Sequence, residues 1–128
     1  MGQRCPAATL LGIARLEGHR FIINSRGVAT LVPDPACAVH GVLWELSESD
    51  ELRLDGYEGV SSDTYRKKFV NVTTSGENTV PAFAYVARDS SSGSPRPGYM
   101  ERIVAAAEAH GLPEEYVREL RTWLRIGD

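Results

Sequence analysis

VHGVLWEL, residues 39–46, is the strongest strand candidate in the chain, because apolar and β-branched side chains dominate it. Gly41, inside this run, indicates a bulge or a close approach of another backbone segment. Ser47 follows directly, and three of the next four residues are acidic. A serine N-cap followed by an acidic first turn predicts a short helix, which should run to about Leu54.

Five other stretches on either side of this strand and helix are predicted to form strands. They are residues 9–16, 21–23, 28–32, 65–73 and 80–87. Turn residues separate them, and the Pro-Asp-Pro sequence at residues 33–35 is expected to break the chain. The last two stretches predict a hairpin whose turn passes through residues 75–78. The sheet should therefore contain five or six strands.

The C-terminal third predicts a loop and two helices. Residues 89–97 (DSSSGSPRP) form the only low-complexity stretch and are expected to be a mobile surface loop. The first helix should bury one face and stop near Gly111, and the second should begin at Pro113. The expected buried residues are Tyr99, Ile103, Ala106 and Ala107 in the first helix, and Tyr116, Val117, Leu120, Trp123 and Leu124 in the second. A small sheet with one short helix and two C-terminal helices is an α+β pattern.

Length and composition restrict the class of protein. The chain has 128 residues, of which 42% are hydrophobic and 24% charged, as expected for a single globular domain over residues 1–128. The net charge of -3 and the absence of a basic stripe argue against a nucleic-acid partner. No apolar stretch reaches the roughly 20 residues that a membrane helix needs, and residues 1–6 lack the apolar middle of a signal peptide. A cytoplasmic location is therefore expected.

Common metal and nucleophile motifs are missing from the sequence. The histidines, His19, His40 and His110, are far apart and share no ligand spacing, so no metal site is expected. Cys5 and Cys37 do not form a CxxC pair and are expected to be free thiols. The chain has no phosphate-binding glycine motif and no serine nucleophile elbow.

Glu58 is the candidate acid or base. It lies in LDGYEGV, residues 54–60, in a predicted turn between a helix and a strand, where Leu54, Tyr57 and Val60 surround it. Apolar walls favour the protonated form of a carboxyl group, and so raise its pKa toward the range where it can shuttle protons. A solvated glutamate or a helix cap is the alternative that this pattern leaves open.

Three tyrosines stand at the ends of predicted elements. Tyr65 opens a strand, Tyr85 lies near the end of the next strand, and Tyr99 begins a helix. Phenol groups in such places can line a cleft while their rings pack against the core. Ordinary packing at the core edge is the more common role of such tyrosines and is the alternative.

The order of these motifs resembles the gamma-glutamylcyclotransferase superfamily, which includes the AIG2-like proteins. The resemblance covers nearly all of the chain, and its most specific part is VHGVLW followed by LDGYEGV. It implies a small, mixed, barrel-like sheet with peripheral helices, and an enzyme without a cofactor. Such enzymes release an amine from a gamma-glutamyl dipeptide or amine and close the glutamyl part into 5-oxoproline. The implied roles are catalysis by Glu58 and substrate binding by Tyr65, Tyr85, Tyr99 and Gly41.

The reaction implied by the resemblance suits a single carboxyl group. The α-amine of the substrate is the nucleophile, so a base must first accept its proton. Glu58 would take that proton and then deliver one to the departing amine. Tyrosine hydroxyls would hold the α-carboxylate of the substrate or line the walls of the site.

One family feature is not found in this sequence. Family members carry a first strand that ends in a Tyr-Gly-Ser-Asn turn, whose backbone N–H groups bind the glutamyl part, and residues 1–6 resemble the segment that follows this turn. The alternative function is therefore a ligand-binding module without catalysis, or a homodimer formed through an unpaired strand edge.

Overall fold

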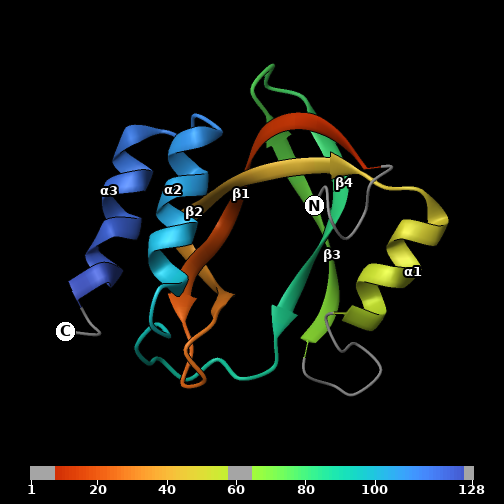
Figure 1. Ribbon diagram of the computed structural model, residues 1–128. Helices are drawn as coiled ribbons and strands as arrows, with labels where there is room; N and C mark the ends of the chain where they lie inside the picture. Colours follow the sequence, from red (N-terminus) through yellow and green to blue (C-terminus); the bar gives the residue numbers. More distant parts are fainter. Residues whose placement is uncertain (1–7, 58–64, 126–128) are drawn as a thin grey trace.

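The computed structural model describes residues 8–57 and 65–125 (Figure 1). It contains four strands and three α-helices, followed by a short 3₁₀ turn at Trp123–Arg125. The strands are β1 (Thr9–Ile23), β2 (Ala29–Glu45), β3 (Tyr65–Thr74) and β4 (Thr79–Ala87). The helices are α1 (Glu48–Tyr57), α2 (Tyr99–Ala109) and α3 (Glu114–Thr122). None of the helices in these two ranges is long and apolar enough to cross a membrane.

The sheet consists of two antiparallel hairpins that meet at one end. Its strand order is β2-β1-β3-β4. The two hairpins pair with each other only where Ala14 and Arg15 face Thr74 and Thr73. Away from that junction the sheet curls, and the Ala87 N–H of β4 donates a hydrogen bond to Thr30 Oγ1 of β2 at 2.9 Å. The two outermost strands thus touch, which confirms the expected α+β, barrel-like fold, although all the described pairings are antiparallel.

β1 and β2 are each longer than the sequence predicts, so there are four strands instead of five or six. Glu17 pairs with Ala38, but His19 pairs with Pro33. The residues of β2 between Pro33 and Ala38 therefore form a long bulge. Bulges let a strand continue past extra residues. β2 is an edge strand, where proline is tolerated. The prediction that residues 33–35 end a strand is therefore wrong.

The start of α1 follows the sequence prediction. Ser47 Oγ accepts a hydrogen bond from the Asp50 N–H at 3.2 Å, and the Ser47 carbonyl accepts one from the Glu51 N–H at 3.0 Å. Ser47 is therefore the N-cap, as expected. The helix continues to Tyr57, three residues beyond the predicted end at Leu54.

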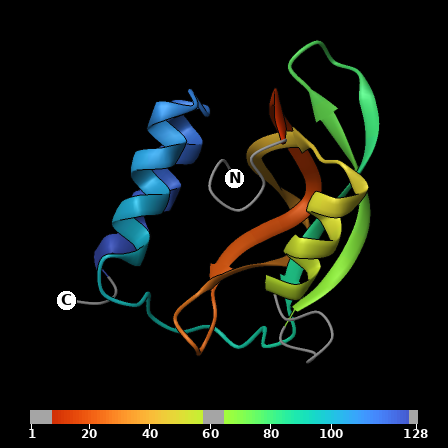
Figure 2. The same cartoon turned by 45° about the vertical axis from the view of Figure 1, so that its right-hand side comes forward.

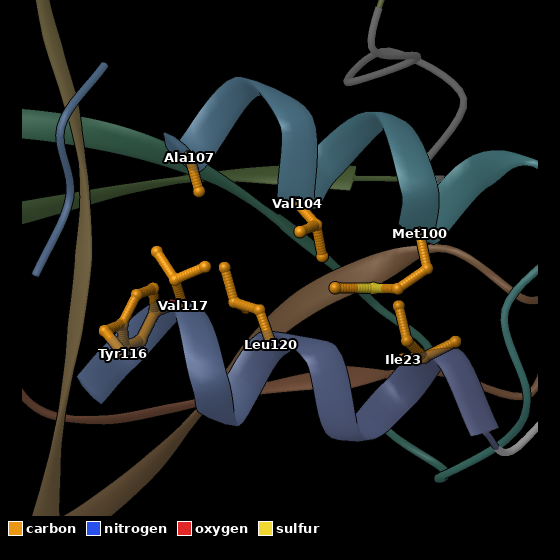
Figure 3. Close-up of a cluster of buried hydrophobic side chains, with 7 residues drawn as sticks. All are labelled: Ile23, Met100, Val104, Ala107, Tyr116, Val117 and Leu120. Atoms are coloured by element: carbon orange, nitrogen blue, oxygen red, sulfur yellow. The ribbon is translucent and has the colours of Figure 1, made fainter. Parts of the chain in front are cut away.

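The three helices lie on two sides of the sheet. α2 and α3 pack together on one side, and α1 lies beside the β3–β4 hairpin on the other (Figure 2). Figure 3 shows the cluster of buried side chains between α2, α3 and the end of β1. Its members are Ile23, Met100, Val104, Ala107, Tyr116, Val117 and Leu120.

Three of the five residues predicted to be buried in the last helix are buried, whereas Trp123 and Leu124 lie in the 3₁₀ turn that follows and are only partly buried. The buried face of α2 is shifted by one residue. Tyr116, Val117 and Leu120 are buried in α3. In α2 the buried residues are Met100, Val104 and Ala107, whereas Ala106 is exposed. Tyr99 is only partly buried and its hydroxyl accepts a hydrogen bond from the Ala29 N–H at 2.9 Å. This bond anchors the start of α2 to β2, and the buried face of the helix lies one residue further along the chain than predicted.

The loop between β4 and α2 is tied to the β1–β2 turn, contrary to the expectation of a mobile segment. The Gly93 N–H donates to the Ile23 carbonyl at 2.8 Å, and the Arg96 N–H donates to the Gly27 carbonyl at 3.1 Å. The fully buried Asn24 amide donates to the Asp89 carbonyl at 3.0 Å. Composition alone did not reveal these partners, because they come from a turn more than 60 residues away in sequence.

Adding a side chain at Gly93 should therefore destabilise the fold. A Cβ at this position would lie 2.4 Å from the Asn24 carbonyl oxygen, so the backbone must shift. Gly93→Ala is expected to lower the free energy of unfolding by about 1–3 kcal/mol, measured by urea denaturation. Ser92→Ala, an exposed neighbour, is the control and should change it by less than about 0.5 kcal/mol. Equal effects of the two variants would contradict the tight contact.

Candidate active site

The expected acid or base, Glu58, lies outside the described residues. Both flanks of its segment are described, since α1 ends at Tyr57 and β3 begins at Tyr65. The described neighbours of the candidate site are therefore the end of α1 and the strands β3 and β4.

Tyr65 and Tyr85 lie on one face of the β3–β4 hairpin. Tyr65 pairs with Ala87, and Lys67 pairs with Tyr85. Because side chains alternate between the two faces of a sheet, Tyr65, Lys67 and Tyr85 share a face. The structure thus brings together two of the three predicted tyrosines, and it adds a lysine that the sequence analysis did not select.

A hydrogen-bonded network connects this face to the last turns of α1. The Tyr85 hydroxyl donates to Asp55 Oδ1, and Lys67 Nζ lies 2.9 Å from the same carboxylate. Lys67 also lies 3.5 Å from Glu51 and 4.6 Å from the centre of the Phe83 ring. The side chains of Asp55 and Lys67 are only 26% and 16% exposed. Sequence analysis missed both residues, since their contact depends on how α1 packs on the hairpin.

The network keeps Asp55 ionised. Burial alone would raise the pKa of this carboxyl group, but the hydrogen bonds from Tyr85 and Lys67 and the lysine charge together lower it below its usual value. Asp55 therefore acts as a hydrogen-bond acceptor at neutral pH.

This lowered pKa predicts a specific loss of stability in acid. A carboxyl group with a lower pKa in the folded state stabilises the fold above its unfolded-state pKa of 3.8, and that stabilisation disappears as the pH falls through the folded-state value. The urea midpoint of Asp55→Asn should therefore fall less steeply than that of the wild type below about pH 4. Parallel curves for the two proteins would show that Asp55 contributes nothing to the acid transition.

A mostly apolar cavity of about 530 Å³ lies beside the network and includes Tyr85 in its wall. Leu54 of α1, Trp44 of β2 and Phe83 of β4 also line it. Cavities of this size hold small organic molecules. The phenol of Tyr85 therefore lies where a polar network borders an apolar space.

Tyr65 belongs to a second, smaller cavity of about 180 Å³. Charged side chains of both signs, Arg26, Arg96 and Asp89, line it together with the buried Asn24. Arg96 Nε donates to the Arg26 carbonyl at 2.9 Å, and the Ser25 hydroxyl donates to the Asp89 carboxylate. Groups with opposite charges are therefore held at the rim of the same pocket.

Tyr99 and Gly41 line neither the cavity of Tyr85 nor that of Tyr65. The Tyr99 hydroxyl is used to accept the Ala29 N–H, so it joins α2 to β2. Gly41 pairs in regular register with Ala14 and lines a third cavity of about 140 Å³. No described atom lies within 4 Å of a Cβ built on Gly41, so the expected close approach is not found there. The nearby bulge is instead in β1, between Leu10 and Gly12.

Residues 8–57 and 65–125 show no site for a metal ion or a disulfide, and Cys5 lies outside these ranges. No group of three histidine, cysteine or acidic side chains converges among residues 8–57 and 65–125. Cys37 is a free thiol, and it donates a hydrogen bond to Asp34 Oδ2 at 3.4 Å.

Comparison with known proteins now identifies the family. The model of the AIG2-like family matches residues 38–120. A human gamma-glutamylcyclotransferase is 31% identical over 92% of this chain and 68% of its own length, and the mouse protein of that name is 29% identical with the same coverage. The chain belongs to the AIG2-like, gamma-glutamylcyclotransferase family.

Solved structures of similar proteins confirm the fold. A structure named gamma-glutamyl cyclotransferase superposes with a TM-score of 0.87 at 30% identity, covering 94% of this chain and 77% of the other. YkqA from Bacillus subtilis gives a TM-score of 0.82 at 25% identity, over 91% of this chain and 45% of its own. Family membership and the fold confirm the resemblance seen in the sequence and the cyclotransferase-like function that it implies. They do not test the individual site residues.

Proposed function

We propose that this member of the gamma-glutamylcyclotransferase family cyclises the gamma-glutamyl group of a small dipeptide or amine to 5-oxoproline and releases the amine. Glu58 is the acid and base, and Tyr65 and Tyr85 line the site. The observation that supports this most strongly is the bond network between Asp55 of α1 and Tyr85 of β4, on the face that also carries Tyr65.

Chain connectivity supports a place for Glu58 in this site. Glu58 follows Asp55 by three positions, and three residues of chain span at most about 11 Å. Asp55 is itself bonded to Tyr85 and Lys67. A carboxyl group that close in sequence to Asp55 can reach the space beside the two tyrosines.

The proposed reaction is an intramolecular acyl transfer. Glu58 accepts a proton from the substrate α-ammonium, and the free amine attacks the gamma-carbonyl carbon. The new C–N bond closes a five-membered ring, the old amide C–N bond breaks, and the protonated Glu58 gives its proton to the leaving nitrogen. The ring nitrogen then loses its second excess proton, which the released amine takes up to leave as an ammonium. Neither water nor a cofactor is consumed. Because both reacting groups belong to one molecule, the enzyme gains rate chiefly by holding the substrate in its curled form.

The zwitterionic end of a gamma-glutamyl compound suits the pocket at Tyr65. That end carries an ammonium and a carboxylate, and the pocket offers Asp89 alongside Arg26 and Arg96. Binding of Tyr99 and Gly41 to the substrate stays a prediction from the resemblance, and each residue lies outside the two cavities that Tyr85 and Tyr65 line.

The direct test is formation of 5-oxoproline from gamma-glutamyl dipeptides and from gamma-glutamyl amines. Turnover of either class is expected, and the ratio of the two rates identifies the amine that is released. Calorimetry with the same compounds addresses the alternative function, because tight binding without turnover would show a ligand-binding module.

The expectations about assembly and location are also proposals. Phe69 on β3 and Leu11 on β1 are 77% and 53% exposed, so an apolar surface is available for a homodimer. Sedimentation velocity tests this, and a monomer at all concentrations would exclude it. The cytoplasmic location expected from the sequence can be tested by imaging a fluorescent fusion.

A further inference from the structure

Tyr85 has a single proton to donate, and that proton is already used. A phenol carries one O–H donor and accepts through its oxygen lone pairs. In this structure the Tyr85 hydroxyl donates to Asp55 Oδ1. Any additional hydrogen bond at the Tyr85 oxygen must therefore be one in which that oxygen accepts.

The neighbours of Asp55 keep its carboxylate ionised, so that it can only accept the hydrogen bond from Tyr85. Lys67 Nζ lies 2.9 Å from the carboxylate, which keeps it charged and limits its rotation. Lys67 is held in turn by Glu51 at 3.5 Å and by the Phe83 ring at 4.6 Å. The Phe83 ring also packs edge-on against Tyr85, with the ring centres 5.6 Å apart. The phenol is thus fixed both at its hydroxyl and at its ring.

We infer that Asp55 is a positioning residue that makes Tyr85 a hydrogen-bond acceptor toward the substrate, so that Tyr85 recognises an N–H group and not a carboxylate. This inference rests on the proposed function, because it assumes that Tyr85 faces the substrate. It replaces the expectation that the tyrosine hydroxyls hold the α-carboxylate, at least for Tyr85. A gamma-glutamyl compound offers N–H donors at its α-ammonium and at its amide.

Binding of two simple ligands separates the two possibilities. L-glutamine carries an ammonium and an amide N–H, whereas glutarate presents only carboxylates, which are acceptors. Calorimetric titration of both ligands should show that Asp55→Asn and Tyr85→Phe each weaken glutamine binding by roughly tenfold, as expected when a charge-assisted network is lost. Neither substitution should weaken glutarate binding. Equal weakening of both ligands by Tyr85→Phe would overturn the inference.

The double variant tests whether the two residues act together. Once Tyr85 is phenylalanine, Asp55→Asn should weaken glutamine binding no further, because its effect acts through the phenol. Full additivity of the two substitutions would show that Asp55 does not act through Tyr85. Tyr85→Phe keeps the ring contact with Phe83 and the Asp55–Lys67 ion pair, so it tests the inference even if Asp55→Asn folds poorly.

One further comparison completes the test. Asp34→Asn removes an equal charge from an aspartate that contacts Arg20 and Cys37 instead, and it should bind both ligands as the wild type does. Because these titrations measure binding, they decide the inference even if no 5-oxoproline is formed. A failed turnover assay would count only against the proposed reaction.

Discussion

Glu58→Gln should lower the rate of 5-oxoproline formation by at least about a hundredfold, since a positioned acid or base contributes 10²–10⁴-fold. Glutamine has the same shape but cannot accept the proton of the α-ammonium. Substrate binding should change little, because the amide can still make hydrogen bonds in the site. Steady-state kinetics should therefore show the loss in kcat and only a small change in KM.

Glu48→Gln provides the matched control. Glu48 is an exposed glutamate at the start of α1, so the substitution removes the same charge and leaves the proposed site intact. Its kcat should equal that of the wild type. Equal turnover by Glu58→Gln and the wild type would remove Glu58 from the mechanism, whatever the substrate.

Leu120→Ala should produce the largest loss of stability, about 2–5 kcal/mol. Leu120 is 3% exposed and lies in the cluster that joins α2, α3 and the end of β1. Removing its side chain leaves a cavity where α2, α3 and the end of β1 pack together. Guanidinium denaturation followed by circular dichroism measures the change in the free energy of unfolding.

Two observations check the cause of that loss. Ala106→Ser on the exposed side of α2 should change the free energy of unfolding by less than about 0.5 kcal/mol. The folded fraction of Leu120→Ala should keep its kcat, because the cluster lies on the other side of the sheet from α1 and Asp55 (Figure 2). A fall in kcat without a fall in stability would contradict the separation of core and site.

Local signals in the sequence predicted the parts of the fold that local chemistry controls. The Ser47 cap and the buried stripe of α3 depend on neighbours within a turn or two of the same helix, and both are confirmed. Gly41 was selected for a bulge that the structure places in β1 instead, at Gly12. The position of a bulge depends on how two strands pair, and this pairing cannot be derived from the sequence of one strand alone.

The candidate site could be predicted only in part. Tyr65 and Tyr85 were selected individually, and their common face follows from the β3–β4 register. Asp55 and Lys67 lie 12 residues apart in sequence and meet because α1 packs against the hairpin. Their contact is tertiary, so no spacing rule for helices or strands reveals it. The resemblance supplied Glu58, which the pattern of its neighbours alone left ambiguous.

The narrow junction between the two hairpins has a consequence for how the chain folds. β1–β2 and β3–β4 are each built from neighbours in sequence, and only the contacts of Ala14 and Arg15 with β3 extend the sheet from one to the other. Each hairpin can therefore form before the segment between them, which contains α1, is closed. The entropy of closing that segment is then lost in a single step. The two hairpins are therefore expected to behave as local folding units that join late, through this junction, the Ala87–Thr30 bond and the loop bonds to the β1–β2 turn. The Asp55–Tyr85 network belongs to the second hairpin and the helix that precedes it.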